Sequence, residues 1–451
     1  MRGMRDVTAD DLARIRADLA VARDGLLARS AAEVAEILGG VGARFADPSD
    51  PLRRAALEGL PAEAALSPPL AEAVLDGMAV DWTAARLVRL LEAEFDDPRV
   101  LDRFVVRNGS AASDHGEQDG GRRGRTVRAF GPSLCVQISS GGVPGVSVNA
   151  LIRSLLVKAP TLIKPGAGDT LLTRLFAEAL ADVDPALGAA VAVRYWRGEE
   201  RDVTAAALDG AEVVVAYGSD QAVRSVRNLT PATARFVGYH HRFGIGLVGR
   251  EALGAGVEKV AAHVARAVAM FEHRGCVCPH IVFVEEHGNV VPEAFAELVA
   301  GALEGLERRW PTDGASGGRE VERAALVQAR GTVELQEAAG AARMLHGHEA
   351  SWTVVFESDL VQLPQLPGRS VRIRGVSDLD DVPAMVGRAG RHLQSVGYAG
   401  DERRAMGLAE ALTRAGATRI VPFEHMSFPP AWWLHDGRGP LETLVRWAEV
   451  E

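Results

Sequence analysis

The first hundred residues carry the apolar pattern of helices. One apolar face recurs at helical spacing in the set Leu12, Ile15, Leu19, Ala22 and Leu26. Thr8 and Ser30 each stand three positions before a carboxylate, which is the pattern of a capping box at a helix start. We therefore expect an amphipathic helical region over residues 8–105.

The apolar pattern stops at residue 107. The segment RNGSAASDHGEQDGGRRGRT consists of glycine, serine and charged residues, with almost nothing to bury. This composition predicts a surface loop or a hairpin extension over residues 107–127. Its arginines, Arg122, Arg123 and Arg125, could meet an anionic ligand, although a solvated loop is the commoner use of such a sequence.

From residue 128 onward, short β-rich runs alternate with helical segments, which is typical of a parallel sheet built from βαβ units. The expected strands are residues 134–138, 161–164, 190–195, 212–217 and 235–238. The expected crossover helices are residues 147–158, 170–180, 201–208 and 220–228. We predict an α/β fold with a doubly wound, nucleotide-binding topology.

A second α/β unit begins near residue 250. A strand at 244–248 and a helix at 256–271 lead into a strand at 281–285. The helices expected beyond it are 292–310 and 321–328, separated by the glycine-rich break DGASGGRE, and the further strands are 352–357 and 371–373.

Length and composition fit this division. A chain of 451 residues is long enough for two or three packed units, and 47% hydrophobic with 24% charged residues is ordinary for a soluble globular protein. A net charge of −10 gives no general attraction to nucleic acid or anionic lipid, so neither is an expected partner. Charged residues interrupt the apolar stretches, so no membrane span is expected, and three cysteines fit a reducing cytoplasm.

Cys276 is the candidate nucleophile. It follows Gly275 in FEHRGCVCPH, where a helix gives way to a buried-looking strand, and such a turn can expose a thiolate. A reactive thiolate needs a nearby cation, and Arg274 and His273 are its sequence neighbours. An isolated cysteine is more often a small buried hydrophobe, an interpretation that fits Cys135 well.

The same segment contains other soft metal ligands. His273, Cys276, Cys278 and His280 lie close together, but Cys-x-Cys flanked by histidines lacks the usual spacing of a zinc site. We therefore expect no metal centre.

Two strand ends could hold a phosphate or a ribose. VAYGSD ends a strand at Gly218 and Ser219 where a helix begins, and backbone amides there favour an anion. Lys164 lies at the carboxyl end of the strand in TLIKPG, and ligands of open parallel sheets bind at such strand ends. A surface lysine without a ligand would give the same sequence pattern. G-x-G-x-x-G, a P-loop and a serine hydrolase elbow are all missing from the sequence.

Taken together, these motifs resemble the aldehyde dehydrogenase superfamily and, within it, the acyl-CoA reductase family of the LuxC type. The segments that carry the resemblance are FGPSLCVQISSGGVPG, TLIKPG, VAYGSD, GYHHRFG, EHRGCVCPH and the carboxy-terminal W-x-H-D-G of residues 433–437. Their order along the chain matches the family, and the similarity runs from about residue 45 to the end.

The resemblance implies a function. It places Cys276, not Cys278, at the nucleophile position, assigns Lys164, Gly218 and Ser219 to the cofactor, and makes His241 a proton carrier. The implied reaction is reduction of an acyl thioester, on CoA or a carrier protein, to an aldehyde through an S-acyl-cysteine with NADPH or NADH. A cytoplasmic homo-oligomer with a possible acyl-activating partner enzyme is also implied.

The resemblance also divides the chain. The expected parts are a helical region packing on the cofactor domain (1–106), a loop or hairpin (107–127), a nicotinamide-nucleotide-binding domain (128–249), a catalytic thiol domain (250–420) and a carboxy-terminal segment (421–451). We expect that last segment to return to the cofactor domain or to a subunit interface. Its aromatic residues could pack domains together, line a subunit contact or line an acyl tunnel, and they are Phe423, Phe428, Trp432, Trp433 and Trp447.

Three departures from the family pattern bear on activity. Gly142 replaces the superfamily's asparagine, which removes a side-chain donor for an oxyanion. Gly238 falls where the superfamily has its hydrolytic glutamate, which favours reduction of the acyl intermediate over hydrolysis. His240, His241 and Arg242 replace G-H-K. The alternatives are therefore a weakly active acyl relay or scaffold subunit, and an aldehyde, semialdehyde or acyl-phosphate enzyme of the same fold.

Overall fold

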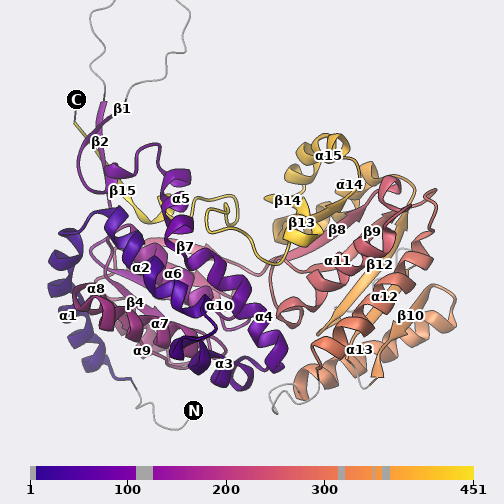
Figure 1. The fold of residues 1–451 in the computed structure, drawn as a ribbon, viewed down its shortest axis with the longest axis horizontal. Helices are drawn as coiled ribbons and strands as arrows, with labels where there is room; N and C mark the ends of the chain where they lie inside the picture. Colours follow the sequence, from indigo (N-terminus) through magenta and orange to yellow (C-terminus); the bar gives the residue numbers. More distant parts are fainter. Residues whose placement is uncertain (1–6, 108–124, 313–319, 349–350, 358–365, 451) are drawn as a thin grey trace, which may run out of the picture.

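The amino-terminal residues form helices, as predicted. The structure is a computed structural model that describes residues 7–107, 125–312, 320–348, 351–357 and 366–450. The helices are α1 (Ala9–Leu27), α2 (Ala31–Ala46), α3 (Pro51–Ala64), α4 (Pro68–Ala79) and α5 (Ala84–Glu94). Thr8 and Ser30 form the two capping boxes at α1 and α2. Figure 1 shows these helices covering the first of two large sheets.

The first sheet has the predicted doubly wound topology. Its strands are β3 (Cys135–Ile138), β4 (Thr161–Lys164), β5 (Val191–Val193), β6 (Val213–Tyr217) and β7 (Arg235–Tyr239), all parallel in the order β5-β4-β3-β6-β7. Its connections contain α6 (Val146–Leu156), α7 (Thr170–Val183), α8 (Pro185–Ala189), α9 (Arg201–Leu208) and α10 (Asp220–Leu229). The strand order reverses between β3 and β6, because β4 and β5 lie on one side of β3 and β6 and β7 lie on the other. Open parallel sheets bind ligands at such a switch point.

The second sheet has seven strands. These are β8 (Phe243–Val248), β9 (Pro279–Glu285), β10 (Ala342–His346), β11 (Thr353–Glu357), β12 (Ser370–Val376), β13 (Leu393–Ala399) and β14 (Arg419–Pro422). Their order is β10-β11-β12-β9-β8-β13-β14, and β10 alone pairs antiparallel. Its helices are α11 (Val257–Ala269), α12 (Pro292–Arg309), α13 (Glu320–Ala338), α14 (Val382–Val386) and α15 (Glu402–Arg414).

The sequence pattern missed several elements of this sheet. Strands β10, β13 and β14 and helices α14 and α15 were not predicted, and α13 runs beyond the residue 328 expected as its end. Strand β13 has the sequence LQSVGYA and is almost entirely buried. Its small and polar residues do not give the apolar pattern that predicts a buried strand. Strand β8 pairs with β9 and β13, so the segment 128–249 contains one strand of the second sheet.

A third, small sheet joins distant parts of the chain. Strands β1 (Val105–Arg107), β2 (Arg125–Phe130) and β15 (Arg446–Val450) pair antiparallel in the order β1-β2-β15. Strands β1 and β2 are therefore the two arms of a hairpin, and β15, from the carboxy-terminal part of the chain, pairs with β2. Arg122 and Arg123 lie outside the described residues, and Arg125 pairs with Glu449 on β15.

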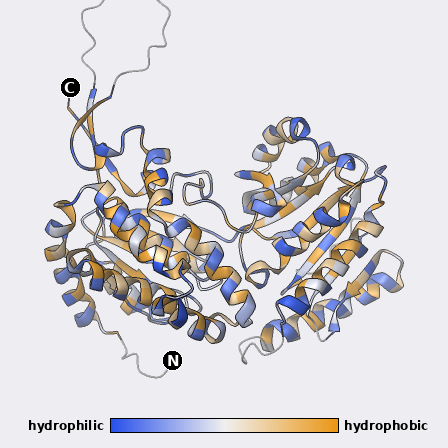
Figure 2. Cartoon of the chain, viewed as in Figure 1, coloured by the Kyte–Doolittle hydropathy of each residue, from blue (hydrophilic) through white to orange (hydrophobic). Residues whose placement is uncertain are grey.

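Hydrophobic residues gather on the strands of the two large sheets and on the helix faces that cover them (Figure 2). Leu162 and Val214 on the first sheet, and Ile245 and Val284 on the second, are fully buried. None of the helices in the described part of the chain is long and apolar enough to cross a membrane.

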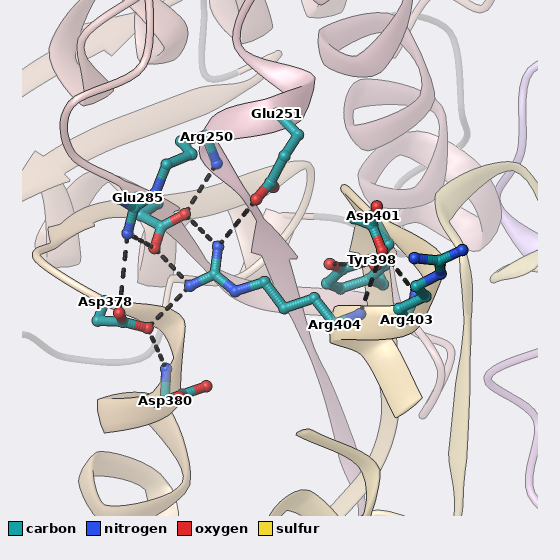
Figure 3. Close-up of polar contacts among 9 residues, drawn as sticks. All are labelled: Arg250, Glu251, Glu285, Asp378, Asp380, Tyr398, Asp401, Arg403 and Arg404. Carbon is teal, nitrogen blue, oxygen red and sulfur yellow. Dashed lines mark hydrogen bonds and ion pairs between the residues drawn. The ribbon is translucent and has the colours of Figure 1, made fainter. Parts of the chain in front are cut away.

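A buried ion network ties the second sheet to α15 (Figure 3). Glu285, the last residue of β9, has no exposed surface and pairs with Arg404 of α15 at 2.5 Å and with Arg250 at 2.6 Å. Arg404 also contacts Asp378, beyond β12, at 2.8 Å. Burial by itself would raise the pKa of Glu285, but hydrogen bonds from Arg404 and Arg250 outweigh it and hold the pKa well below its usual range.

This network predicts acid-dependent stability. A carboxylate with a depressed folded-state pKa stabilises the fold above its unfolded pKa, near 4.5, and loses that contribution as the pH falls further. Glu285→Gln should lower the free energy of unfolding by about 3 kcal/mol at pH 7, because it leaves two arginines facing a neutral group. The difference from wild type should shrink as the pH falls below 4.5, as measured by urea unfolding. Glu178→Gln, in an exposed pair, is the control; an equal effect of both substitutions would contradict the prediction.

Candidate active site

Cys276 lies directly after a strained turn. Phe271, Glu272 and His273, in the short helix η4 (Met270–His273), have φ values of 57°, 54° and 61°. Each non-glycine residue in this left-handed region costs about 1 kcal/mol or more. The turn is held because Phe271 is buried and the carboxylate of Glu272 pairs with the buried Arg369 at 2.7 Å. Strain of this kind typically marks a functional site.

Two cavities meet at Cys276. The first, which we call the apolar cavity, has a free volume of about 120 Å³. Its walls come from α4, α6, the Cys276 turn and the carboxy-terminal segment 427–435. The second, which we call the polar cleft, is lined by the turns that follow β3, β6 and β7. The residues shared by both are Val143, Val146, Tyr217, Gly275, Cys276 and His435.

The polar cleft brings together four of the five predicted site residues. Cys276, His241, Gly218 and Ser219 all line it. Gly218 has a φ of 158°, close to extended backbone, and Ser219 caps α10 by accepting from the amide of Ala222 at 3.2 Å. The amino terminus of α10 therefore opens toward the cleft, where its amides and dipole favour an anion.

Lys164 is the fifth residue, and it lies at the end of β4 outside the residues that line the polar cleft. Its ammonium stands over the ring of Tyr195, 5.4 Å from the centroid, and burial lowers its pKa. The turn after Lys164 touches the turn after β3, since a Cβ on Gly166 would lie 2.0 Å from the backbone nitrogen of Gly141. Glycine at residue 166 is thus required by close backbone packing.

The charges around Cys276 are not those that its sequence neighbours suggest. Arg274 donates to the carbonyl of Ala65 at 3.3 Å, and burial lowers the pKa of His273 to about 4, which leaves it neutral. Burial raises the pKa of the Cys276 thiol to about 12; Asp436 adds to the rise, and Arg242 and Arg419 oppose it. The cations that act on the Cys276 thiol, Arg242 and Arg419, come from two distant segments.

The carboxy-terminal segment supplies residues that sequence reasoning did not place in the site. His435 stacks between Tyr239 and Trp433, with ring centroids 4.3 and 4.5 Å apart, and Tyr217 stacks on Tyr239. Burial lowers the pKa of His435 to about 3. Asp436, whose side chain is 1% exposed, pairs with Arg242 at 3.3 Å. The W-x-H-D-G motif was the available signal for these positions.

Only part of the aromatic carboxy-terminal segment lines a cavity. Phe428 and Trp433 line the apolar cavity. Phe423 packs against Gly246, and Trp432 lies under the guanidinium groups of Arg86 and Arg89, 4.3 Å from each. Trp447 packs on Phe95. Both packing and cavity lining are therefore represented among these five aromatic residues.

The glycines that depart from the family pattern have different surroundings. Gly142 lines the polar cleft, and a Cβ there would make only ordinary contacts, the nearest at 3.5 Å from the carbonyl of Arg274. At Gly238 a Cβ would lie 2.9 Å from Phe236 and from Val223, so a larger side chain does not fit without movement.

The possible metal ligands are arranged for packing. The ring centroids of His273 and His280 lie 4.3 Å apart with the rings tilted by 40°, and the sulfur of Cys278 faces the carbonyl of Met270 at 3.6 Å. Within the described ranges, no group of three or more histidine, cysteine or acidic residues could hold a metal ion.

Comparison with known sequences agrees with the geometry. A family model for acyl-CoA reductase (LuxC) matches residues 28–447. Similar curated proteins are the long-chain acyl-protein thioester reductases of Aliivibrio fischeri, 22% identical over 339 residues, and of Photorhabdus luminescens, 23% identical over 333 residues. Each alignment covers 72% of this chain and 65% of the relative, so the chain matches slightly under two thirds of those proteins.

Solved structures resemble the whole chain. A NAD-dependent benzaldehyde dehydrogenase from Corynebacterium glutamicum has a TM-score of 0.71 at 14% identity, covering 99% of this chain and 91% of that one. An NADP-dependent glyceraldehyde-3-phosphate dehydrogenase from Bacillus halodurans C-125, complexed with NADP, has a TM-score of 0.72 at 13% identity, covering 98% and 91%. The predicted aldehyde-dehydrogenase-like fold is confirmed.

The charges at Cys276 predict how its thiol reacts. Alkylation by iodoacetamide should be slow at pH 7 and should rise with pH without a plateau below pH 9, because burial and Asp436 raise the thiol pKa. Asp436→Asn should speed alkylation several-fold at pH 8; asparagine tolerates the left-handed φ of 53° at this position. Cys276→Ala gives the background, since Cys135 and Cys278 are buried. A plateau below pH 8 in the wild type would show a thiolate already formed.

Proposed function

The chain belongs to the acyl-CoA reductase (LuxC) family, and from that premise we propose that it reduces an acyl thioester to an aldehyde with a nicotinamide nucleotide as hydride donor. One observation carries the proposal: Cys276 stands where an apolar cavity meets a polar cleft. The apolar cavity suits an acyl group, and the cleft suits a phosphate-bearing cofactor. The names of the relatives, long-chain acyl-protein thioester reductases, support the same chemistry.

The residues of the polar cleft fit a dinucleotide. The amino terminus of α10, with Gly218 and Ser219, would hold phosphate, and Ser140 and Gly142 border the same cleft at the end of β3. Lys164, one strand away, would reach the ribose or phosphate oxygens of an extended cofactor. When bound, NADPH or NADH would supply the hydride.

Acyl transfer to Cys276 is the first step. The sulfur of Cys276 attacks the thioester carbonyl, the bond to the donor sulfur breaks, and the proton of the Cys276 thiol passes to the departing thiolate of CoA or a carrier protein. His241, which lines the cleft, is the proposed carrier of that proton. Arg242 and Arg419 favour the charged sulfur during attack.

Reduction of the S-acyl group follows. Addition of hydride to the acyl carbon gives a thiohemiacetal anion, and breakage of its bond to Cys276 releases the aldehyde and a thiolate. The same two arginines stabilise this thiolate until it takes up a proton. Gly238 and the crowded space around it leave no carboxylate to activate water at that position, which favours aldehyde over acid.

Gly142 supports a second candidate, an acyl relay that accepts and passes on acyl groups without reducing them. Loss of one oxyanion donor typically costs about 100- to 1000-fold in rate. A relay needs a delivery enzyme and a carrier, so an acyl-activating partner enzyme is expected for both candidate functions.

That the protein is a homo-oligomer and that it is located in the cytoplasm also stay predictions.

The first test is the acyl-enzyme itself. After incubation with acyl-CoAs, intact-protein mass should show one acyl adduct that is absent from Cys276→Ala and is discharged by NADPH or NADH as the cofactor is oxidised. Cys276→Ala should make no aldehyde yet bind the cofactor normally. An adduct that resists both cofactors would favour the relay, and aldehyde formation by Cys276→Ala would refute the assignment.

The second test restores the missing donor. Gly142→Asn should speed acyl transfer and reduction at least tenfold, because the position has room for a Cβ and an amide could donate to the oxyanion. Gly142→Ala is the matched control, since it adds the Cβ without the donor. Equal rates for both variants would mean that a backbone amide already fills this role.

A further inference from the structure

The apolar cavity contains a cation. Arg153 of α6 lines it, on the same helix face as Val146 and Asn149. Asp81 lines it too, and the remaining wall is mostly hydrocarbon and aromatic, including Phe271, Phe428 and the run Pro429–Pro430. A guanidinium beside such a wall is costly unless a partner compensates it.

Within the described part of the chain, no carboxylate forms an ion pair with Arg153 within 4.0 Å. The side-chain partner of Arg153 is the hydroxyl of Tyr217, which also lines the cavity. Asp81 and Glu94 are the carboxylates whose charges act on the same neighbourhood. Asp81 is held by Arg86 at 2.7 Å, and Glu94 accepts the amides of Leu441 and Glu442 at 3.0 Å each. Both carboxylates have closer partners than Arg153, although the charge of Arg153 opposes the rise in pKa that burial causes at each of them.

A second donor stands beside Arg153. The indole N–H of Trp82 donates to the side-chain oxygen of Asn149 at 2.7 Å. An indole can only donate, so this bond fixes the orientation of the amide and turns its NH₂ group away from Trp82. Asn149 lines the apolar cavity one helical turn from Arg153. The cavity that begins at Cys276 therefore carries two groups of hydrogen-bond donors in a largely apolar wall.

We infer that the apolar cavity binds an acyl group that carries a second carboxylate, which Arg153 and Asn149 recognise. The inference rests on the proposed function and names its substrate class. A guanidinium fork matches a carboxylate in two parallel hydrogen bonds, and the amide of Asn149 adds a third donor. A plain alkyl chain would leave these donors facing hydrocarbon, so the cavity should discriminate against it.

The test compares thioesters of equal chain length that differ only at the far end. Succinyl-CoA and butyryl-CoA, adipoyl-CoA and hexanoyl-CoA, and suberoyl-CoA and octanoyl-CoA form three such pairs. The rate of adduct formation on Cys276, followed by intact-protein mass, should favour the carboxylated member at least tenfold in one pair or more. This comparison uses the wild-type protein and depends on no variant.

Variants then locate the preference. Arg153→Met should lower the rate with the preferred carboxylated thioester about 10- to 100-fold and bring the ratio within its pair close to 1. Arg153→Lys keeps the charge without the fork and should retain part of the ratio. Arg174→Met is the control, because Arg174 lies on α7 in an exposed pair with Glu178 and should leave the ratio unchanged.

The outcomes separate the two proposals. Equal adduct rates within every pair, or faster rates with the alkyl members, would overturn the inference and leave the thioester chemistry standing. A preference that persists in Arg153→Met would also overturn it. Absence of an adduct from every thioester would remove the proposed function and this inference together.

Discussion

The site depends on the turn that holds Cys276 between two sheets. Three consecutive non-glycine residues adopt a left-handed backbone before the cysteine, and the pair between Glu272 and Arg369 holds the middle one. Arg369 directly precedes β12, so the second sheet itself fixes the turn. The turn lies at the amino end of β9, and the polar cleft gathers the ends of β6 and β7 of the first sheet around it. The cysteine is thereby presented at the junction of the two units.

The charged groups that act on the sulfur of Cys276 come from segments far away in the sequence. Asp436 and Arg419 come from the carboxy-terminal part, and Arg242 comes from the turn after β7. Burial is the largest of these effects and raises the pKa of the thiol to about 12. A protonated thiol is less prone to oxidation than a thiolate. In the proposed reaction the proton has to move as the acyl donor arrives, and His241 lines the same polar cleft as Cys276.

Sequence patterns captured the parts of this molecule that are locally determined. The five strands of the first sheet and both capping boxes follow from β-rich runs and from Thr8 and Ser30. The pattern failed where tertiary contacts override composition, as in β13, whose glycine and serine residues are buried under Phe423 and Met426. The family resemblance named Cys276, His241, Gly218 and Ser219, and the fold brings these four residues to one cleft. No sequence signal pointed to Arg153, because only folding brings α6 and the carboxy-terminal segment to the same cavity.

The contrast between the two cavities fits the proposed function, in which one cysteine serves both. A cofactor with phosphates needs amide donors and a positive helix end, which α10 and the strand ends supply without any long side chain. An acyl group needs a wall of side chains, which α4, α6 and the carboxy-terminal segment supply. The strand ends belong to the fold that related proteins share, whereas the side chains of the cavity wall can differ between them. Substitutions along the wall can therefore change which acyl group binds and leave the cofactor cleft intact. Asn149 and Arg153 lie on that wall.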